Sequence, residues 1–172
     1  MKKANLENFY KEKIIDYLDQ INPRAKSIGA VNCILNSGGT IIGNNTDWYG
    51  FSMALKNNDI NPKGREIIVI GAGGSAKSIL YALKGMGVQK IFLLNRSIEN
   101  ARTLHDEYIS AHSLDDAEEI IKTDSIIINT TSVGMQSNQT PIDFALIHKN
   151  QILIDIIYTP FNTSILQYGK KI

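Results

Sequence analysis

The sequence is short of cysteine, of net charge and of long apolar runs. Its single cysteine, Cys33, excludes a disulfide within one chain and a metal cluster built from several cysteines. Cys33 stands in an apolar run, where a thiol is typical of a small core residue. A chain without disulfides fits a reducing compartment, so a cytoplasmic location is expected.

Net charge is nearly absent, because 18 lysines and arginines face 17 aspartates and glutamates, which leaves +1 at pH 7. Such a chain has no general attraction for nucleic acid or for an anionic membrane, and neither is expected as a partner. Nowhere do 18 uncharged apolar residues follow one another, and the basic N-terminus lacks the apolar core of a signal peptide. These absences predict a soluble protein.

What is present is the composition of an ordinary folded protein. The chain has 172 residues, of which 43% are hydrophobic and 20% are charged. That length supports one complete core with an appendage, and it is too short for two full-sized domains. A change of rhythm near residue 62 predicts a partial lobe over residues 1–62 and a complete domain over residues 63–172.

The segment up to residue 62 predicts a small mixed lobe. Apolar residues at helical spacing predict an amphipathic helix over residues 10–20. Two short apolar runs, residues 28–35 and 40–42, are separated by a pair of glycines and predict a hairpin. A helix follows Asp47, whose side chain is expected to cap its first N–H groups. Residues 61–64, Asn-Pro-Lys-Gly, then predict a linker.

Beyond the linker, apolar runs alternate with helical patterns. Runs without polar interruption indicate strands that are buried on both faces, and their alternation with helices indicates right-handed crossovers in a parallel sheet. We therefore expect an α/β fold, a Rossmann-type doubly wound parallel sheet with helices on both faces. The expected strands are residues 66–70, 90–94, 108–111, 125–129 and 151–157, and the expected helices are residues 75–84, 98–107 and 114–122.

A glycine-rich motif follows the first of these strands and opens the first helix. Gly71 permits a tight turn, Gly73 lets the backbone approach a pyrophosphate, and Ala76 allows the helix to lie close to the sheet. N–H groups at the start of the helix would bind the phosphates. The alternative is a turn that binds nothing, but the flanking strand and helix favour a dinucleotide site. The predicted cofactor residues here are Gly71, Ala72, Gly73, Gly74, Ser75 and Ala76.

The end of the next strand predicts which dinucleotide is bound. An NAD site usually has an acidic residue there, which hydrogen-bonds the ribose 2′-hydroxyl. This chain has Asn95, Arg96 and Ser97 instead, and the Arg96 guanidinium suits a 2′-phosphate. We therefore predict NADP(H) as the cofactor, with a solvated surface arginine as the alternative reading of Arg96.

Five motifs occur in order along the chain: residues 28–32 (IGAVN), 43–51 (GNNTDWYGF), 95–97 (NRS), 128–135 (INTTSVGM) and 155–160 (DIIYTP). Together they resemble the shikimate dehydrogenase family. The resemblance implies an NADP-dependent oxidoreductase that reversibly reduces 3-dehydroshikimate to shikimate in aromatic amino-acid biosynthesis. The alternatives are a non-catalytic NADP-binding module and a quinate/shikimate dehydrogenase, and a homodimer is a possible assembly.

The resemblance also implies roles for individual residues. Lys11 and Asp47 match the catalytic pair, although the threonine and proline that usually precede the lysine are absent here. Asn32, Asn45 and Tyr158 match residues of the substrate site, and the two asparagines could instead stabilise turns. The loop beside the ribose and nicotinamide is matched by Thr130, Thr131, Gly134 and Met135, for which ordinary loop packing is the alternative.

Neither a metal ion nor a complete substrate lobe is expected. The histidines, His105, His112 and His148, have no partners at metal-ligand spacing, so no metal is predicted. Complete family members have an N-terminal α/β segment with a serine pair for the substrate carboxylate, and a C-terminal helix. Neither has a counterpart here, so the resemblance implies a shortened substrate lobe and leaves open whether this chain turns over substrate.

Overall fold

The computed structural model describes residues 2–5 and 10–172. The chain folds into two compact units. The first unit comprises Met1–Asn61 and Gly73–Met86, and the second comprises Pro62–Ala72 and Gly87–Ile172. Helix α3 (Gly74–Gly85) follows the glycine-rich turn in sequence but packs with the N-terminal residues.

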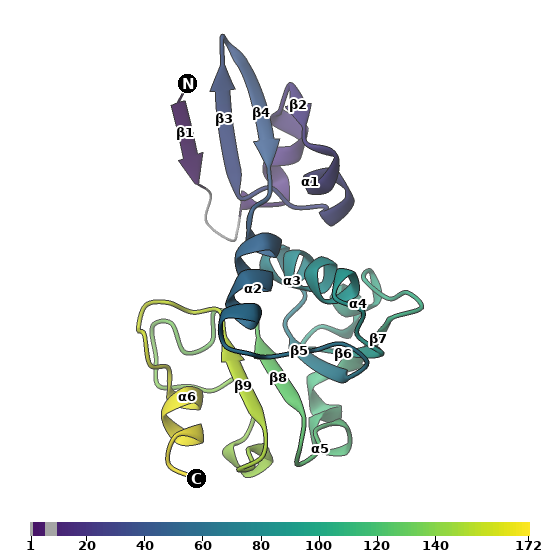
Figure 1. Cartoon of the computed structure of the whole chain (residues 1–172), viewed down its shortest axis with the longest axis vertical. Helices are drawn as coiled ribbons and strands as arrows, with labels where there is room; N and C mark the ends of the chain where they lie inside the picture. Colours follow the sequence, from purple (N-terminus) through teal and green to yellow (C-terminus); the bar gives the residue numbers. More distant parts are fainter. Residues whose placement is uncertain (1, 6–9) are drawn as a thin grey trace. The chain divides into compact units, whose positions relative to one another are not determined.

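The first unit contains a four-stranded sheet in the order β1-β3-β4-β2 (Figure 1). The predicted hairpin is confirmed as β3 (Cys33–Ser37) and β4 (Thr40–Asn44), which pair antiparallel. The two glycines between them both have positive φ, as a tight hairpin turn requires. The edges of the sheet are β1 (Lys2–Asn5), antiparallel to β3, and β2 (Gln20–Ile21), parallel to β4.

The first hairpin strand starts later than predicted, because a short helix precedes it. Helix α1 (Pro23–Ile28) begins with proline in its first turn, and the Asn22 side chain accepts a hydrogen bond from the backbone N–H of Arg24. It ends at Gly29 in the left-handed conformation, with φ of 72°. The apolar residues at the start of the predicted strand therefore belong to this helix and its C-terminal cap.

The amphipathic helix predicted over residues 10–20 was wrong in type and length. The structure has a 3-10 helix, η2 (Lys13–Tyr17), with no buried residue. Short helices are stabilised mainly by burying an apolar face, and the isoleucines of η2 are only partly buried. The following residues pair as β2 instead.

Helices α2 (Asp47–Asn57) and α3 lie side by side in the first unit (Figure 1). Helix α2 buries Phe51 and Leu55. The prediction that Asp47 caps α2 was wrong, since Thr46 is the residue before the first turn and the Thr46 side chain makes no capping hydrogen bond. The Asp47 carboxylate instead accepts hydrogen bonds from the Lys11 and Asn32 side chains.

The second unit is built on a five-stranded parallel sheet in the order β7-β6-β5-β8-β9. This is the predicted Rossmann-type arrangement, with the sequence-first strand at the centre. The order reverses between β5 and β8, so the loops after these strands meet at the switch point. The strands are β5 (Glu66–Ile70), β6 (Lys90–Asn95), β7 (Ile109–Ser113), β8 (Ile126–Asn129) and β9 (Ile152–Asp155).

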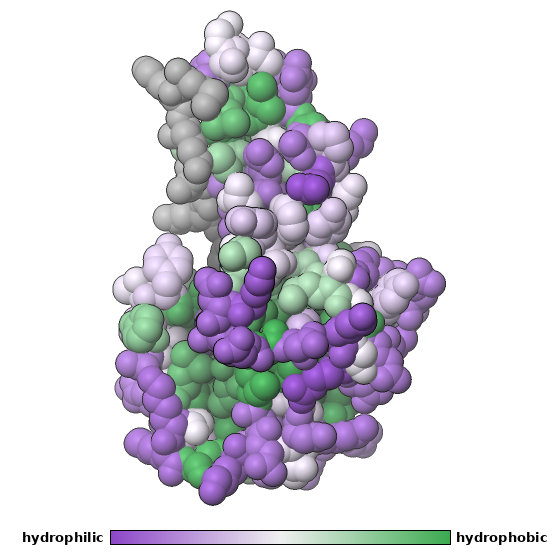
Figure 2. Space-filling view, in the orientation of Figure 1, coloured by the Kyte–Doolittle hydropathy of each residue, from purple (hydrophilic) through white to green (hydrophobic). Residues whose placement is uncertain are grey.

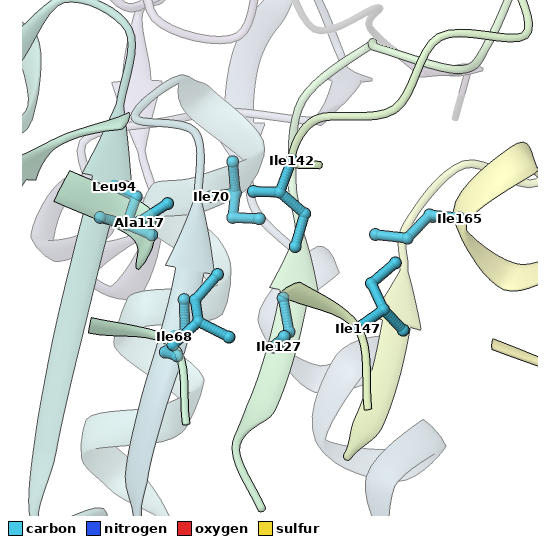
Figure 3. Packing of buried hydrophobic residues seen from close by; sticks show 9 residues of the cluster. Ile68, Ile70, Leu94, Ala117, Ile127, Ile142, Ile147 and Ile165 are labelled. Carbon is cyan, nitrogen blue, oxygen red and sulfur yellow. The ribbon is translucent and has the colours of Figure 1, made fainter. Parts of the chain in front are cut away.

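Isoleucines dominate the core of the second unit (Figure 3). Ile68 and Ile70 of β5 and Ile127 of β8 pack with Ile147 and Ile165, which lie outside the sheet. The intervening residues of β5 are buried as well, as expected for a strand shielded on both faces. Each fully buried isoleucine contributes about 1.5–3 kcal/mol relative to an exposed one.

The helices of the second unit are shorter than predicted. The helix expected over residues 98–107 ends at Arg102, because the Asp106 carboxylate accepts hydrogen bonds from the N–H groups of Tyr108 and Ile109 and turns the chain into β7. The helix expected over residues 114–122 starts at a Ser113 capping box and divides into a 3-10 turn and one α turn. The helical segments of the second unit are α4 (Ile98–Arg102), η3 (Leu114–Asp116), α5 (Ala117–Ile120), η4 (Phe144–Leu146) and α6 (Ser164–Gly169).

Figure 2 shows hydrophilic residues over much of the visible face of each unit, with hydrophobic residues between them. Across residues 2–5 and 10–172, no helix combines the length and the apolar character that crossing a bilayer needs.

Candidate active site

Lys11 and Asp47 form an ion pair in the first unit. The Lys11 Nζ lies 2.7 Å from the Asp47 Oδ2, and the lysine side chain is 9% exposed while the aspartate side chain is 33% exposed. The Lys11 backbone is also held, since its carbonyl accepts a hydrogen bond of 2.7 Å from the Val31 N–H. Residues 6–9, where the sequence departs from the family pattern, lie outside the described residues.

Asn32 binds the other oxygen of the same carboxylate. Its Nδ2 donates to the Asp47 Oδ1 at 2.5 Å, and its Oδ1 accepts from the Thr46 backbone N–H at 2.9 Å. Asn32 immediately precedes β3, and Asp47 is the first residue of α2, where the helix dipole favours a negative charge. The carboxylate is therefore held from both sides, by an ammonium and by an amide.

Asn45 lies inside the first unit, with only 2% of its surface exposed. Its Nδ2 donates to the Ala30 carbonyl at 2.8 Å and to the Ser78 Oγ at 2.9 Å, and its Oδ1 accepts from the Asp47 N–H at 3.1 Å. These hydrogen bonds fix the backbone of Asp47. The predicted contact between Asn45 and substrate stays a prediction.

This arrangement brings together the groups that acid-base chemistry requires. An ammonium can give up a proton, and a neighbouring carboxylate can orient it and accept hydrogen bonds from a ligand hydroxyl. Because the Lys11 side chain is nearly buried, removing the Asp47 charge would leave the ammonium poorly compensated. Protein groups thus hold both members of the ion pair, while 33% of the Asp47 side chain stays exposed.

The glycine-rich turn begins in the second unit with a residue that must be glycine. Gly71 has φ of 105°, and a Cβ there would lie 2.6 Å from the Thr130 Oγ1 and 2.9 Å from the Thr131 Cγ2. The Thr130 Oγ1 in turn donates to the Ile70 carbonyl at 2.7 Å. The turn after β5 and the loop after β8 are therefore packed directly against each other at the switch point.

Gly73 meets a different requirement, because the space beside it is open. It precedes the first turn of α3, and among the described residues no heavy atom lies within 4 Å of a Cβ built on it. A bare backbone at the start of a 12-residue helix, with N–H groups that have no acceptor within the helix, fits a pyrophosphate. Ser75 and Ala76 of the same motif are buried.

The loop after β6 carries the predicted 2′-phosphate residues. Asn95 shapes this loop, since its Nδ2 donates to the Ser97 carbonyl at 2.8 Å. Arg96 is exposed, and within the described part of the chain no hydrogen bond or ion pair is found for its guanidinium. The Ser97 Oγ donates to the Glu99 Oε2 at 3.1 Å. A hydrogen bond from its own backbone N–H and the bond from Ser97 hold the pKa of the Glu99 carboxyl below its usual value.

Sequence reasoning missed a polar network at the ends of β8 and β9. Asn129 is buried, and its Nδ2 donates to the Asp155 Oδ1 at 3.1 Å while its Oδ1 accepts from the Thr131 Oγ1 at 2.7 Å. The Asp155 Oδ2 accepts from the Thr163 Oγ1 at 2.7 Å. The signal was present, because both strands are apolar runs that end in one polar residue. This network fixes the loops that follow the two strands.

The remaining predicted residues lie in the loops after β8 and β9. Gly134 has φ of 100°, Met135 is partly exposed, and Tyr158 is 84% exposed. Over residues 2–5 and 10–172, no group of three or more His, Cys, Asp or Glu side chains is placed to hold a metal ion. The expectation that the protein needs no metal stays a prediction.

Comparison with known proteins decides the family. The model of the family described as "Shikimate / quinate 5-dehydrogenase" matches residues 52–158, well over half of the chain. The chain belongs to this family. The resemblance predicted from the five motifs is thereby confirmed, as is the α/β fold with its parallel sheet.

Shikimate dehydrogenases of several bacteria share the sequence and the fold. The shikimate dehydrogenase (NADP(+)) of Streptococcus thermophilus is 41% identical over 181 residues. The crystal structure of shikimate dehydrogenase from Aquifex aeolicus superposes with a TM-score of 0.88 at 37% identity and covers 99% of this chain. That of Thermus thermophilus, in complex with NADP(H) and shikimate, superposes with a TM-score of 0.84 at 32% identity and also covers 99%. The chain spans 62–64% of the length of these relatives.

Proposed function

We propose that the chain carries the catalytic pair and the nucleotide site of a shikimate dehydrogenase, which reversibly reduces 3-dehydroshikimate to shikimate with NADPH. The observation that carries the proposal is the Lys11–Asp47 ion pair, completed by Asn32. Support comes from the family match and from relatives that are named as NADP(+)-dependent shikimate dehydrogenases. A related structure that contains NADP(H) and shikimate supports both ligands.

The residues of the first unit handle the proton. Lys11 gives a proton from its ammonium to the oxygen of the ring ketone as negative charge develops there, and it takes the proton back in the reverse direction. Asp47 holds the Lys11 amine in place and accepts a hydrogen bond from a ring hydroxyl, while Asn32 orients the carboxylate. Bound NADPH would supply the hydride for the ketone carbon.

The nucleotide is bound by backbone and by one guanidinium. The glycine-rich turn accommodates the pyrophosphate, because Gly73 is open and α3 begins there. Arg96 binds the 2′-phosphate, which contributes about 1.5–3 kcal/mol and therefore a preference of roughly tenfold to a hundredfold for NADPH over NADH. Asn95, Ser97 and Ala72 shape the same site. The ribose and nicotinamide lie beside Thr130, Thr131, Gly134 and Met135, and Tyr158 contributes to substrate binding.

The division of labour along the chain is part of the proposal. Residues 1–62 supply a partial substrate-binding lobe, and residues 63–172 supply the NADP-binding domain, although α3 packs with the first unit. Cys33 is buried as a reduced thiol, which supports a cytoplasmic location. A homodimer stays a possible assembly.

Two alternatives rest on specific observations. The glycine-rich turn that fits a pyrophosphate does not include Lys11 or Asp47, so a module that binds NADP without turnover is the first alternative. The family description includes quinate, which favours testing quinate as a second substrate. The two alternatives predict different outcomes of one experiment.

In that experiment, the purified chain is mixed with NADP and either shikimate or quinate, and NADPH formation is followed by absorbance. NADPH binding is titrated by fluorescence on the same sample, and Asp47→Asn serves as the control with the same side-chain shape. Turnover with shikimate that is lost in the variant supports the proposal. Binding without turnover supports the non-catalytic module, and turnover with quinate alone supports the quinate enzyme.

A further inference from the structure

Gly74, the third glycine of the motif, is small for a reason that does not involve the nucleotide. A Cβ on Gly74 would lie 3.0 Å from the Lys11 Cβ and 3.6 Å from the Lys11 Cδ. Its backbone is ordinary helix, so no positive φ demands glycine there. The methylene stem of Lys11 therefore occupies the space that a side chain at position 74 would need.

Ser75, the next residue, contacts the charged end of the same lysine. The Lys11 Nζ donates to the Ser75 Oγ at 3.1 Å and to the Asp47 Oδ2 at 2.7 Å. Ser75 is buried in the first turn of α3. A hydroxyl at this position gives the ammonium a second acceptor in a place with little access to water.

A third contact joins the same two segments. The Lys77 Nζ lies 2.6 Å from the Glu12 Oε2, and the lysine is only 20% exposed. Glu12 follows Lys11 directly, and Lys77 lies two residues after Ser75 in α3. Two consecutive residues of the N-terminal segment are thus held by three residues of one helix.

We propose that the start of α3 positions the catalytic lysine, with Gly74 and Ser75 as positioning residues and the Glu12–Lys77 ion pair as support. The inference rests on the proposed function, because it assigns Lys11 as the proton donor. It divides the glycine-rich motif into two parts. Gly71 and Gly73 serve the turn and the nucleotide, whereas Gly74 and Ser75 serve Lys11.

The proposal predicts that alanine at two neighbouring glycines lowers different quantities, namely kcat at Gly74 and NADPH affinity at Gly73. In Gly74→Ala, the new methyl displaces the Lys11 stem, and kcat falls on the order of tenfold or more because misplacing a reacting group by about 1 Å is costly. NADPH affinity stays within about twofold, since the added methyl would point toward the Lys11 stem. In Gly73→Ala, where the methyl meets no protein atom, NADPH affinity falls and kcat at saturating NADPH changes less.

Gly85→Ala is the matched control, because it places the same methyl in the same helix, where no heavy atom of the described residues lies within 4 Å. It should leave kcat and NADPH affinity unchanged. Ser75 has its own pair of variants: Ser75→Ala should lower kcat without changing NADPH affinity, and Ser75→Thr, which keeps the hydroxyl, should restore kcat. A purely structural role would not give that split or that rescue.

A readout without turnover separates this inference from the proposed function. The rate at which acetic anhydride modifies Lys11 is measured by mass spectrometry, with folding checked by circular dichroism. Lys11 should be modified severalfold faster in Gly74→Ala and Ser75→Ala than in the wild type or Gly85→Ala. If the wild type shows no turnover, the proposed function fails, but the modification rates still decide this inference.

The inference is overturned if Gly74→Ala and Gly85→Ala give the same modification rate. It is equally overturned if Gly74→Ala loses NADPH affinity while kcat and Lys11 protection are kept. Should Gly74→Ala fail to fold, Ser75→Ala and its threonine rescue decide the question alone.

Discussion

The first unit builds its site from side chains, whereas the second unit builds much of its site from backbone. In the first unit, Lys11, Asn32 and Asp47 come from segments far apart in sequence and meet through charge and hydrogen bonds. In the second unit, the backbone of Gly71 lies close against Thr130 and Thr131 of the loop after β8, at the ends of neighbouring strands. The Lys11–Asp47 pair depends on the functional groups of its side chains, whereas Gly71 depends on the absence of a side chain. The two regions should therefore respond to different kinds of substitution.

The largest effect is expected from the side-chain site. Lys11→Ala and Asp47→Ala should each lower turnover by roughly a hundredfold to ten-thousandfold, the range for a positioned acid-base group. NADPH affinity should hardly change, because both residues belong to the proton chemistry. Steady-state kinetics and a fluorescence titration measure the two quantities. Unaltered turnover in either variant would exclude that residue from the catalytic role.

The backbone site should respond most strongly to Gly71→Ala. The methyl would collide with Thr130 and sit at a positive φ, and together overpacking and backbone strain should lower the free energy of unfolding by about 2–6 kcal/mol. Gly64→Ala is the matched control, since Gly64 also has positive φ, but a Cβ built on it meets no heavy atom within 4 Å in the part of the chain that the structure describes. Urea unfolding of the two variants measures the difference. Equal destabilisation would show that the contact with Thr130 adds nothing to the strain.

Arg96 is an exception within the second unit, because it is a side chain that the cofactor site depends on. Arg96→Ala should weaken NADPH binding by roughly tenfold to a hundredfold and leave NADH binding nearly unchanged. Competitive titration with the two cofactors measures this. Equal affinity of the wild type for NADPH and NADH would remove the assignment of Arg96 to the 2′-phosphate.

The smallest effect is expected at Glu99, two residues from Ser97. Its carboxylate adds negative charge to the loop that would receive a 2′-phosphate, so Glu99→Gln should tighten NADPH binding a few-fold. Because its pKa is lowered, Glu99 stays charged through the neutral range, and the gain should be the same from about pH 7 to 8, where a phosphate monoester is also fully ionised. Glu107→Gln, outside this loop, is the control. A gain that disappears toward pH 8 would contradict this account.

The sequence predicted the second unit better than the first. Strands such as β5 and β8 are apolar runs bounded by turn residues, and the local pattern alone identifies them. The first unit depends on long-range pairing, which local patterns do not reveal. Strand β2 has two residues, and η2 buries none, so neither produces a periodic signal.

The candidate site followed the same rule. The motif around Asp47 predicted the aspartate, but its capping role was wrong, because the Asn32 and Lys11 side chains compete successfully for the carboxylate. No local pattern predicted that Lys11 would contact Ser75, since 64 positions separate them. Buried polar partners such as Asn129 and Asp155 were visible only as polar ends of apolar strands.

The chain leaves the second unit at Ala72, builds α3 within the first, and returns at Gly87. Neither unit is thus a single continuous stretch of the gene. A recombination crossover between the genes of two relatives, placed between α2 and α3, would combine α3 of one parent with α2 of the other, although the two helices pack together. Recombination that treats the units as interchangeable cassettes would therefore have to replace α2 and α3 as a pair.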